Sequence, residues 1–533
     1  MRFSYVLFQV FRFLLPPCII TSVWLHFYPF LHGCSFPTAK RGETVCYFDA
    51  EHAQNAAPDE IAPFRLLALG DPQLEGDTSL PDPNAPFFPS LHALRTGLSS
   101  EPLSSVQAII SKSLLDFGRR DVPTLIRSYR KRIDLWGNDY YLAHVFRSVH
   151  GWTKPTHTAV LGDLLGSQWI GDEEFARRSN RYWHRVFKGT ENVPEELQGS
   201  ARTGGAQETQ TPSLSETLHD QKWSKRLINV VGNHDIGYAG DIDEDRIARF
   251  EQQFGKVNWD IRFRLSPNMS ESLSSNPSVF QQHSPELRLV VLNSMNLDSP
   301  AWTQSAQDAS HAFLDQQSAL TRQQHPEDAT VLLTHIPLQK EAGVCVDGPF
   351  FDYFPPDQGG GIKEQNHLSM GSSRKILDGL FRDPQTARGI ILNGHDHEGC
   401  DSYHYRNMTA SPAGDGNIMP GWDTVHYLHA RSLVNNDDIH GIREITVRSM
   451  MGNYGGNAGL LSGWFDTDAQ RWKFEYSVCV FGIQHFWWVT HGLQVIVLLL
   501  GLATSAAALL EVWSEKVESK KTSDLGTLQK KNS

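Results

Sequence analysis

The sequence lacks an excess of basic residues. Its 48 Lys and Arg are outnumbered by 60 Asp and Glu, which gives a formal net charge of -12. Because affinity for nucleic acid comes mainly from cationic side chains that neutralise phosphates, this balance excludes a general nucleic-acid-binding protein. An anionic substrate would therefore need a local positive centre, which a bound metal ion can supply.

Cysteine is also scarce. There are six in 533 residues, and none forms the paired short spacing of a structural zinc site, so a zinc finger is excluded. Cys18 lies in an apolar run and is interpreted as a small apolar residue. The remaining composition, 40% hydrophobic and 20% charged, is that of a folded protein.

Charged residues are absent from two long runs, Phe13 to Ala39 and Tyr476 to Leu510. Each run is long enough for one membrane crossing. We expect a transmembrane anchor over residues 13–31 and a transmembrane helix over residues 486–510. A cleaved signal peptide is the alternative for the first run, where Pro16 and Pro17 weaken a straight helix.

The charges that flank these runs predict the topology. Arg2 and Arg12 precede the first run and several lysines follow the second, so the termini, residues 1–12 and 511–533, are expected in the cytosol. Everything between the two spans is then luminal, as a linker over residues 32–63 and a domain over residues 64–475.

Two kinds of short signal fit this topology. Glycosylation sequons begin at Asn268 and Asn407 in the luminal part. The chain ends in Lys530-Lys531-Asn532-Ser533, which matches the dilysine signal for return to the endoplasmic reticulum. A solvated basic tail is the alternative for the last four residues. We therefore expect a multi-pass protein of the endoplasmic reticulum membrane that can cycle to the early Golgi.

Short apolar runs that end in polar loops recur along the luminal part: FRLLALGDPQ, HTAVLGDLLG, LINVVGNHD, LRLVVLNSMN, ATVLLTHIPL and GIILNGHDH. Each is typical of a buried strand. Helical stretches alternate with them, for example Glu244 to Phe254 and Ala306 to Gln323. The pattern predicts an α/β fold with layered sheets, interrupted by insertions at about 77–154 and 199–218.

The residues able to bind metal follow these strands. Loops at strand ends are where ligand sites are built in open α/β folds, so these side chains are expected to meet. They are Asp71, Gln73, Asp163, Asn233, His234, His335, His395 and His397. A single histidine is more often a structural residue, but five such motifs in order favour a metal site.

This ordered set resembles the calcineurin-like metallophosphoesterase superfamily, over roughly Phe64 to Tyr405. The resemblance implies a layered β-sandwich flanked by helices, with two metal ions. It implies that Asp163 bridges the metals, that Asp71, His397 and Gln73 complete one site, and that Asn233, His335 and His395 hold the second. His234 is expected to act on the substrate as the catalytic residue.

The residue types suit this chemistry. A hydroxide that bridges two cations can attack phosphorus in line, and His234 can protonate the departing alkoxide as a general acid. Oxygen and imidazole ligands without thiolate suit manganese, iron or zinc and disfavour calcium. We favour manganese by analogy with the family.

Two positions depart from the family pattern. Gln73 stands where a histidine is usual, which should weaken the first site and favour a harder ion such as manganese. Gly166 stands where many relatives have an aspartate that orients the catalytic histidine. Asp235 and Asp396 are the candidates to orient His234 instead.

Cys345 and Cys400 follow two of the histidine motifs and so leave the same metal-binding edge. We hypothesise a disulfide between them that braces the site. Two unpaired cysteines are the alternative.

The luminal domain between two spans, the GDPQ variant and the dilysine end together resemble the glycosylphosphatidylinositol ethanolamine-phosphate phosphoesterases of fungal type. The resemblance implies a phosphodiesterase that removes an ethanolamine-phosphate side branch from a mannose of protein-linked anchors and so aids their export. GPI-anchored proteins would be its substrates, with possible cargo-receptor and coat-protein contacts. The alternatives are a luminal phosphoprotein phosphatase or nucleotidase, and a non-catalytic sorting or manganese-homeostasis protein on the same fold.

Overall fold

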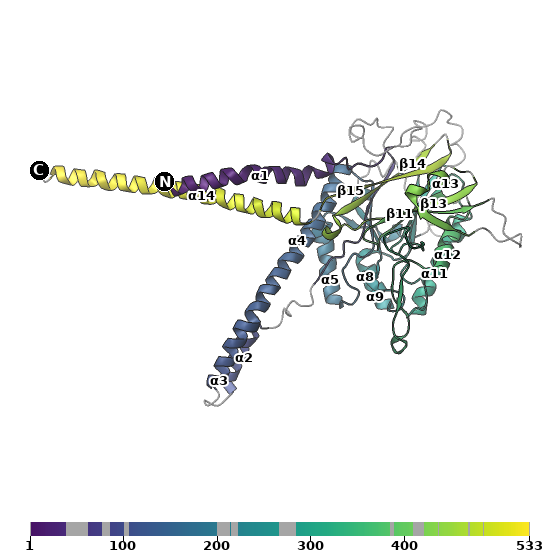
Figure 1. The fold of residues 1–533 in the computed structure, drawn as a ribbon, viewed down its shortest axis with the longest axis horizontal. Helices are drawn as coiled ribbons and strands as arrows, with labels where there is room; N and C mark the ends of the chain where they lie inside the picture. Colours follow the sequence, from purple (N-terminus) through teal and green to yellow (C-terminus); the bar gives the residue numbers. More distant parts are fainter. Residues whose placement is uncertain are drawn as a thin grey trace.

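The computed structural model describes residues 2–38, 62–76, 86–100, 106–199, 214, 222–265, 284–383, 388–408, 421–434, 436, 438–466, 469–482 and 484–531. It has three parts, which Figure 1 shows from one side. A body of sheets and helices carries two long terminal helices, α1 and α14, that leave it side by side. A separate group of helices, α2 to α4, projects from the body in another direction.

The first sheet of the body has the strand order β15-β14-β1-β2-β4-β3. Strands β1, β2 and β4 are parallel, while β14 pairs antiparallel with β1 and continues into the β14–β15 hairpin. The strands are β1 (Phe64–Leu69), β2 (His157–Leu161), β3 (Glu191–Asn192), β4 (Arg226–Val230), β14 (Asn457–Asp466) and β15 (Arg471–Val480).

The second sheet has the order β12-β11-β13-β10-β7-β6-β5, with parallel pairing from β6 through β7 and β10 to β13. Its strands are β5 (Trp259–Arg264), β6 (Glu286–Val291), β7 (Ala329–Leu333), β10 (Arg388–Asn393), β11 (Cys400–Asn407), β12 (Asp423–His426) and β13 (Ile439–Thr446). A small hairpin, β8 (Phe351–Tyr353) and β9 (Ile362–Gln365), lies apart from both sheets.

The two sheets share a core. Leu66 and Ile228 of the first sheet belong to one buried cluster with Leu289, Val331 and Ile390 of the second. Burial of these side chains supplies the main favourable free energy of folding. The expectation of a mixed α/β fold with more than one sheet is therefore confirmed.

Helices cover the outer faces of the sheets. The one-turn helix α8 (Asn233–Ile236) instead follows β4 at the edge of the first sheet, and the helices on the faces are α5 (Asp172–Arg181), α9 (Glu244–Phe254), α11 (Gln304–Thr321) and α12 (Met370–Leu380). Their ends follow local sequence signals, as α9 illustrates: the Asp243 side chain accepts a hydrogen bond from the Arg246 N–H at one end, and Gly255 at φ 96° ends the helix. Short helices complete the body: η4 (Tyr182–Val186), η5 (Glu195–Leu197), α7 (Lys222–Lys225), η7 (Pro356–Gln358), η8 (Tyr427–His429), α13 (Arg431–Val434) and η9 (Gly452–Tyr454).

The two apolar runs form α1 (Phe3–Leu31) and α14 (Gln484–Lys531), which are long and apolar enough to cross a membrane by length and composition. Both extend beyond the predicted spans. Helix α1 begins ten residues before residue 13 and continues through Pro16 and Pro17, and α14 runs into the predicted tail, with Lys530 and Lys531 at its end.

The described residues of the insertion predicted at 77–154, which are 86–100 and 106–154, are mostly helical. They contain α2 (Pro89–Ser100), α3 (Val106–Asp116), a π-helical turn η3 (Phe117–Asp121) and α4 (Val122–Thr153). The insertion at 199–218 lies outside the described residues apart from Gly199 and Leu214. Of the two sequons, Asn268 also lies outside them, and Asn407 is the exposed last residue of β11.

A disulfide that the sequence analysis did not anticipate joins Cys34 to Cys479. It connects the segment after α1 to β15 and so fixes the base of the first helix to the first sheet. Cys18 of α1 is buried and forms no disulfide with any described residue, in agreement with its interpretation as a small apolar residue.

Candidate metal centre

The metal-capable side chains meet at one edge of the sandwich, where β1, β2, β4, β7 and β10 end. Asp71, Asp163 and His397 each offer a ligand atom, and these atoms all lie within 4.8 Å of one another. The carboxylates of Asp71 and Asp163 are buried. These three residues are the ones assigned to the first metal, apart from Gln73.

The second group converges on Asn233. Its Oδ1 atom lies 3.0 Å from His335 Nε2 and 3.0 Å from His395 Nδ1. His335 Nε2 is also 3.3 Å from Asp163 Oδ1. Asp163 therefore contacts both groups, which is the position that a bridging carboxylate must have.

Backbone carbonyls orient both of these histidine rings. His335 donates from Nδ1 to the Leu161 carbonyl at 2.7 Å, and His395 donates from Nε2 to the Gln365 carbonyl at 2.8 Å. In a neutral ring the other nitrogen then carries a lone pair, and in both rings it faces Asn233 Oδ1. When both rings are neutral, three acceptor atoms point at one another, an arrangement that a cation would stabilise and that protonation of His335 relieves when no cation is bound.

The site also contains an acceptor without a donor. Asp71 Oδ2 is buried and has no hydrogen-bond partner among the residues that the structure describes. A buried carboxylate oxygen normally has a partner, because leaving it unpaired costs free energy. The unpaired oxygen, the facing lone pairs and the mixed carboxylate, amide and imidazole donors all fit a pair of divalent cations.

Backbone strain is concentrated in the same residues. Asp71, Gln73, Asp163 and His395 have φ values of 44°, 39°, 50° and 74°, in the left-handed region that residues other than glycine seldom adopt. Each such residue costs about 1–3 kcal/mol and persists only where the surroundings fix it. The folding of the body therefore holds these four residues in strained backbone conformations and so fixes the orientation of their side chains.

Two glycines of the strand-end motifs are required by close approaches. Gly162, at φ 96°, lies so near His335 that a Cβ atom would be 2.1 Å from the ring Nδ1. A Cβ atom on Gly232 would be 2.2 Å from the Asp163 backbone nitrogen. The Gly-Asp and Gly-Asn-His motifs therefore allow loops from different strands to touch.

The charges of the site are strongly coupled. Burial raises the pKa of Asp71 to about 8. Burial also opposes ionisation of Asp163, but His234 and His335 outweigh it and hold the pKa of this carboxyl far below its usual range. Burial opposes protonation of His335, yet the Asp163 carboxylate outweighs burial and raises the pKa of His335 to about 9. Because these groups bind protons so tightly, positive charge at this site is electrostatically favourable.

Gln73 takes an orientation different from the expected one. Its Nε2 atom, and not its carbonyl oxygen, faces the centre, where it donates to Asp163 Oδ2 at 2.9 Å and lies 3.2 Å from His397 Nε2. A carboxylate oxygen attracts an N–H donor, so in this orientation Gln73 holds two ligands in place and presents no oxygen to a metal.

His234 lies at the open side of the site. Its backbone N–H donates to Asp163 Oδ1 at 2.8 Å, and its ring Nε2 is 3.8 Å from Asp163 Oδ2, with 37% of the side chain exposed. The other ring nitrogen, Nδ1, is buried and finds no hydrogen-bond partner in the described part of the chain. Neither candidate proposed to orient this ring is bonded to it.

The two candidates have other roles. Asp235 is buried and accepts hydrogen bonds from the N–H groups of Leu164, Leu165 and Gly232, so it joins two ligand loops. Burial and the Asp163 charge raise the pKa of Asp235 to about 7. Asp396 accepts from the Glu398 N–H within its own loop. Gly166 lies against the loop that carries Gln73: a Cβ atom at this position would be 3.3 Å from the carbonyl oxygens of Gln73 and Leu74.

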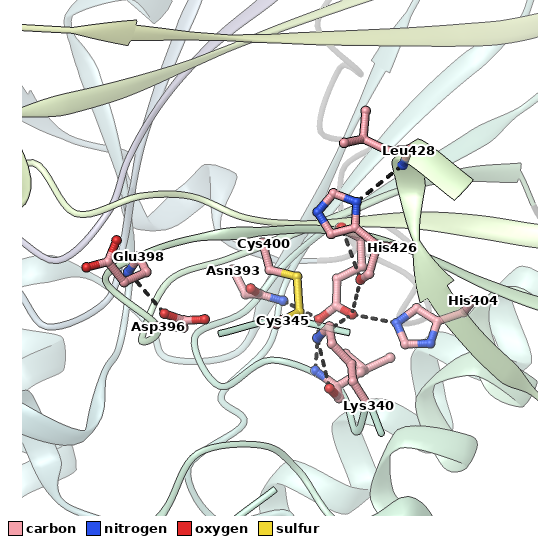
Figure 2. The surroundings of a disulfide bond; sticks show 12 residues. Lys340, Cys345, Asn393, Asp396, Glu398, Cys400, His404, His426 and Leu428 are labelled. Carbon is pink, nitrogen blue, oxygen red and sulfur yellow. Dashed lines mark hydrogen bonds and ion pairs between the residues drawn. A yellow bond between two sulfur atoms is a disulfide. The ribbon is translucent and has the colours of Figure 1, made fainter. Parts of the chain in front are cut away.

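A disulfide joins Cys345 to Cys400, the pair that the sequence analysis proposed. Figure 2 shows Lys340, Asn393 and His404 grouped beside it. These three side chains surround Glu444 of β13, which the sequence analysis missed: Lys340 Nζ is 2.9 Å from its carboxylate, and His404 Nε2 is 2.5 Å from it.

Glu444 connects the loops that carry two of the histidines. It accepts hydrogen bonds from the Leu338 N–H at 2.8 Å and from Asn393 Nδ2 at 2.6 Å. Leu338 follows His335, and Asn393 precedes His395 by two residues. The available signal was the strand alternation, which places Glu444 on the same face as the buried Ile442 two residues earlier, because a buried charge needs partners.

Comparison with known proteins agrees with this geometry. No family model matches the chain. The chain is 34% identical to Protein TED1 of Saccharomyces cerevisiae over 525 residues, which cover 88% of this chain and 92% of that protein. It is 28% identical to an uncharacterized protein of Schizosaccharomyces pombe, with 68% of this chain and 79% of that protein covered.

The chain is also 27% identical to Metallophosphoesterase 1 of Mus musculus over 278 residues, which cover 51% of this chain and 57% of that protein. These relatives imply a phosphoric ester hydrolase that uses divalent metal ions. The chain belongs to the calcineurin-like metallophosphoesterase superfamily, in the family of TED1 and Metallophosphoesterase 1.

Proposed function

We propose that the protein is a two-metal phosphodiesterase that removes the ethanolamine-phosphate side branch from a mannose of protein-linked glycosylphosphatidylinositol anchors. It would act in the lumen of the endoplasmic reticulum, held by α1 and α14 as two membrane spans. The phosphodiester is carried on a glycolipid, so the metal centre must lie close to the membrane surface. Removal of the branch prepares the anchored protein for export.

The observation that carries this proposal is the short path from the metal centre to the start of α14. The ring of Tyr454 packs edge-on against His397, with ring centroids 4.7 Å apart. Tyr454 ends the turn η9, and a Cβ atom on Gly452 of this turn would lie 2.5 Å from the Cβ of Gln484, the first residue of α14. The centre therefore sits next to the base of an apolar helix, which suits a substrate tethered to a membrane.

The disulfides and the terminal helices support a luminal body. Bonds such as Cys34–Cys479 and Cys345–Cys400 persist in oxidising compartments. The start of α1 lies against α14 far from the body, where Arg2 pairs with Glu515 at 2.5 Å, and α14 continues beyond this point. If both helices span the membrane, both termini lie on one side and the body, with its disulfides, on the other.

The residues divide the chemical work. Two divalent cations, which we take to be manganese, would supply a Lewis acid and a nucleophile near neutral pH. Asp163 would hold both cations, together with Asp71 and His397 for one of them and Asn233, His335 and His395 for the other. His234 holds a proton at Nε2, the ring nitrogen that faces Asp163, and donates it to the departing alkoxide.

The test compares the anchor glycans of cells that lack the native enzyme and express wild type, Asp163→Asn or His234→Ala. Mass spectrometry should find the ethanolamine-phosphate branch removed by wild type and retained with both variants. His429→Ala, at an exposed histidine outside the site, is the matched control and should behave as wild type. Equal branch content in all four cell lines would reject the substrate.

A second measurement separates the role of His234 from metal binding. Purified His234→Ala should keep its metal content while turnover is lost, because the ring acts on the leaving group. Loss of metal from this variant would contradict the assigned role.

A further inference from the structure

Helices α2 and α3 and the first half of α4 form an arm that projects from the body (Figure 1). The helices of the arm contact one another. The rings of Phe88 and Phe117 meet with centroids 5.2 Å apart, and the Ser90 N–H and hydroxyl donate to Asp121 at 2.9 and 3.1 Å. Its helices are therefore held together by contacts of their own.

One face of α4 in this arm is apolar and exposed. Ile126, Tyr129, Ile133 and Trp136 are 63%, 49%, 54% and 48% exposed. Their spacing of three, four and three residues places them in one stripe along the helix. A continuous apolar stripe left in water is unfavourable and is typical of an interaction surface.

The stripe faces the start of α14. Trp136, at its inner end, lies with its ring centroid 6.4 Å from those of both Trp487 and Trp488. The next residue, Gly137, is so close to α14 that a Cβ atom would be 1.7 Å from the Trp488 ring. Since α14 continues from these tryptophans into its apolar run, the stripe continues the apolar surface of that helix along the arm.

Basic side chains flank the stripe. At 100° per residue, Arg130 and Arg132 project on either side of it, and both are exposed. Arg119, Arg120 and Arg127 add exposed positive charge nearby. An apolar stripe with tryptophan at one end and arginine along its borders matches a helix that lies among lipid headgroups, where phosphates pair with the cations.

We propose that this arm lies on the luminal surface of the membrane, with the stripe buried at the boundary between headgroups and acyl chains. The proposal rests on the proposed spanning of the membrane by α1 and α14. In Figure 1 the arm leaves the body beside the base of these two helices and runs obliquely to them, and its tip lies on the side toward which they extend. The occupant of the stripe is therefore the bilayer that the terminal helices enter.

The arm also reaches the loop that carries Gln73. Lys131 of α4 pairs with Glu75 at 3.1 Å. Farther along α4, Asp139 pairs with Arg181 at 2.6 Å, and the Arg181 guanidinium also donates to the Glu75 carbonyl at 2.7 Å. Contact of the arm with lipid thus fixes the height of the metal centre above the membrane, at the level where the substrate glycan begins.

The test uses spin labels on the full-length protein with Cys18→Ser and Cys46→Ser, so that the four remaining native cysteines are those of the two disulfides, in vesicles of phosphatidylcholine and phosphatidylserine. Labels go on Ile126→Cys and Ile133→Cys in the stripe, on Thr124→Cys as the matched site on the opposite face, and on Leu499→Cys in α14. Collision with oxygen reports lipid, and collision with a water-soluble nickel chelate reports water. We expect labels 126, 133 and 499 to favour oxygen and label 124 to favour nickel.

Other outcomes overturn the inference in distinguishable ways. Nickel access at 126 and 133 with oxygen access at 499 would place the arm in water and leave the spans intact. Protection of 126 and 133 from both reagents would indicate a protein partner or a second copy of this chain. Nickel access at 499 would reject the spans, and the arm proposal with them.

A second experiment measures turnover of the double variant Ile126→Glu with Ile133→Glu. Turnover of a vesicle-bound phosphodiester should fall by roughly tenfold because the charged side chains oppose insertion, while turnover of a soluble chromogenic phosphodiester stays unchanged. Thr124→Glu is the control and should leave both rates unchanged. Equal loss on both substrates would indicate damage to the fold and would contradict a membrane role for the stripe.

Discussion

Glu444 offers a sharp test of how the ligand loops are held. Its carboxylate and Lys340 are both buried, and their atoms lie 2.9 Å apart. Glu444→Gln removes the negative charge and leaves the Lys340 ammonium buried without a counter-charge, which costs about 3–5 kcal/mol. At about 2 °C of melting temperature per kcal/mol for a domain of this size, the midpoint should fall by roughly 6–10 °C.

The assay is thermal unfolding at neutral pH, followed by circular dichroism. Burial raises the pKa of Glu444, but Lys340 and His404 outweigh it and hold that pKa well below the usual range. The carboxylate therefore contributes its full stability above about pH 4.3, the ordinary glutamate value, and loses it only as the pH falls below that value. The difference between wild type and Glu444→Gln should be constant between pH 6 and 8 by this reasoning.

The matched control is Glu398→Gln. Glu398 pairs with Arg448 at 3.4 Å, and both side chains are about half exposed. Such a surface pair contributes about 0–1 kcal/mol, so its loss should lower the midpoint by no more than roughly 2 °C. Equal effects of the two substitutions would refute the role given to Glu444. The double variant Lys340→Met with Glu444→Leu should recover part of the loss, since no charge is then left unpaired.

Two further predictions concern the metals. In chelator-treated protein, the free energy of unfolding should fall as the pH rises from about 6.5 to 8. The reason is that folded Asp71 and His335, with pKa values raised to about 8 and 9, still bind protons that the unfolded chain has released. Thermal melts with and without Mn²⁺ check this, and a fall in stability with pH that persists in Mn²⁺ would count against a metal centre there. Gln73→His should raise metal affinity by about tenfold, because it places an imidazole beside Asp163 and His397. Titration calorimetry measures this affinity, and weaker binding would show that the Gln73 amide is needed to orient those two residues.

The sequence predicted much of the fold because its signals are local. Each apolar run that ends in a polar loop forms a strand, and the metal-capable residues meet where parallel strands end, since the carboxyl ends of such strands share one edge of a sheet. The Cys345–Cys400 pairing followed from the same rule, because both cysteines leave that edge.

What the sequence did not reveal depends on partners far away in the chain. The Cys34–Cys479 bond joins segments 445 residues apart, and no local pattern selects that pair among six cysteines. The orientation of Gln73 is decided by Asp163 and His397, and the charge of Glu444 is balanced by Lys340 and His404. The continuity of α1 through Pro16 and Pro17 ran against the usual effect of proline within a helix.

The position of β1 in its sheet has a consequence for how the chain is made. Phe64 pairs with Gly463 of β14, so one edge of this inner strand stays bare until nearly the whole body has been synthesised. At about 5–20 residues per second, the delay is roughly 20–80 s. During that time a strand that is buried in the folded protein presents unpaired backbone groups to other chains. A nascent chain of this kind is expected to depend on chaperones for its first minute, and a chain that stops short of β14 should be degraded even though every metal-capable residue of the site is already present.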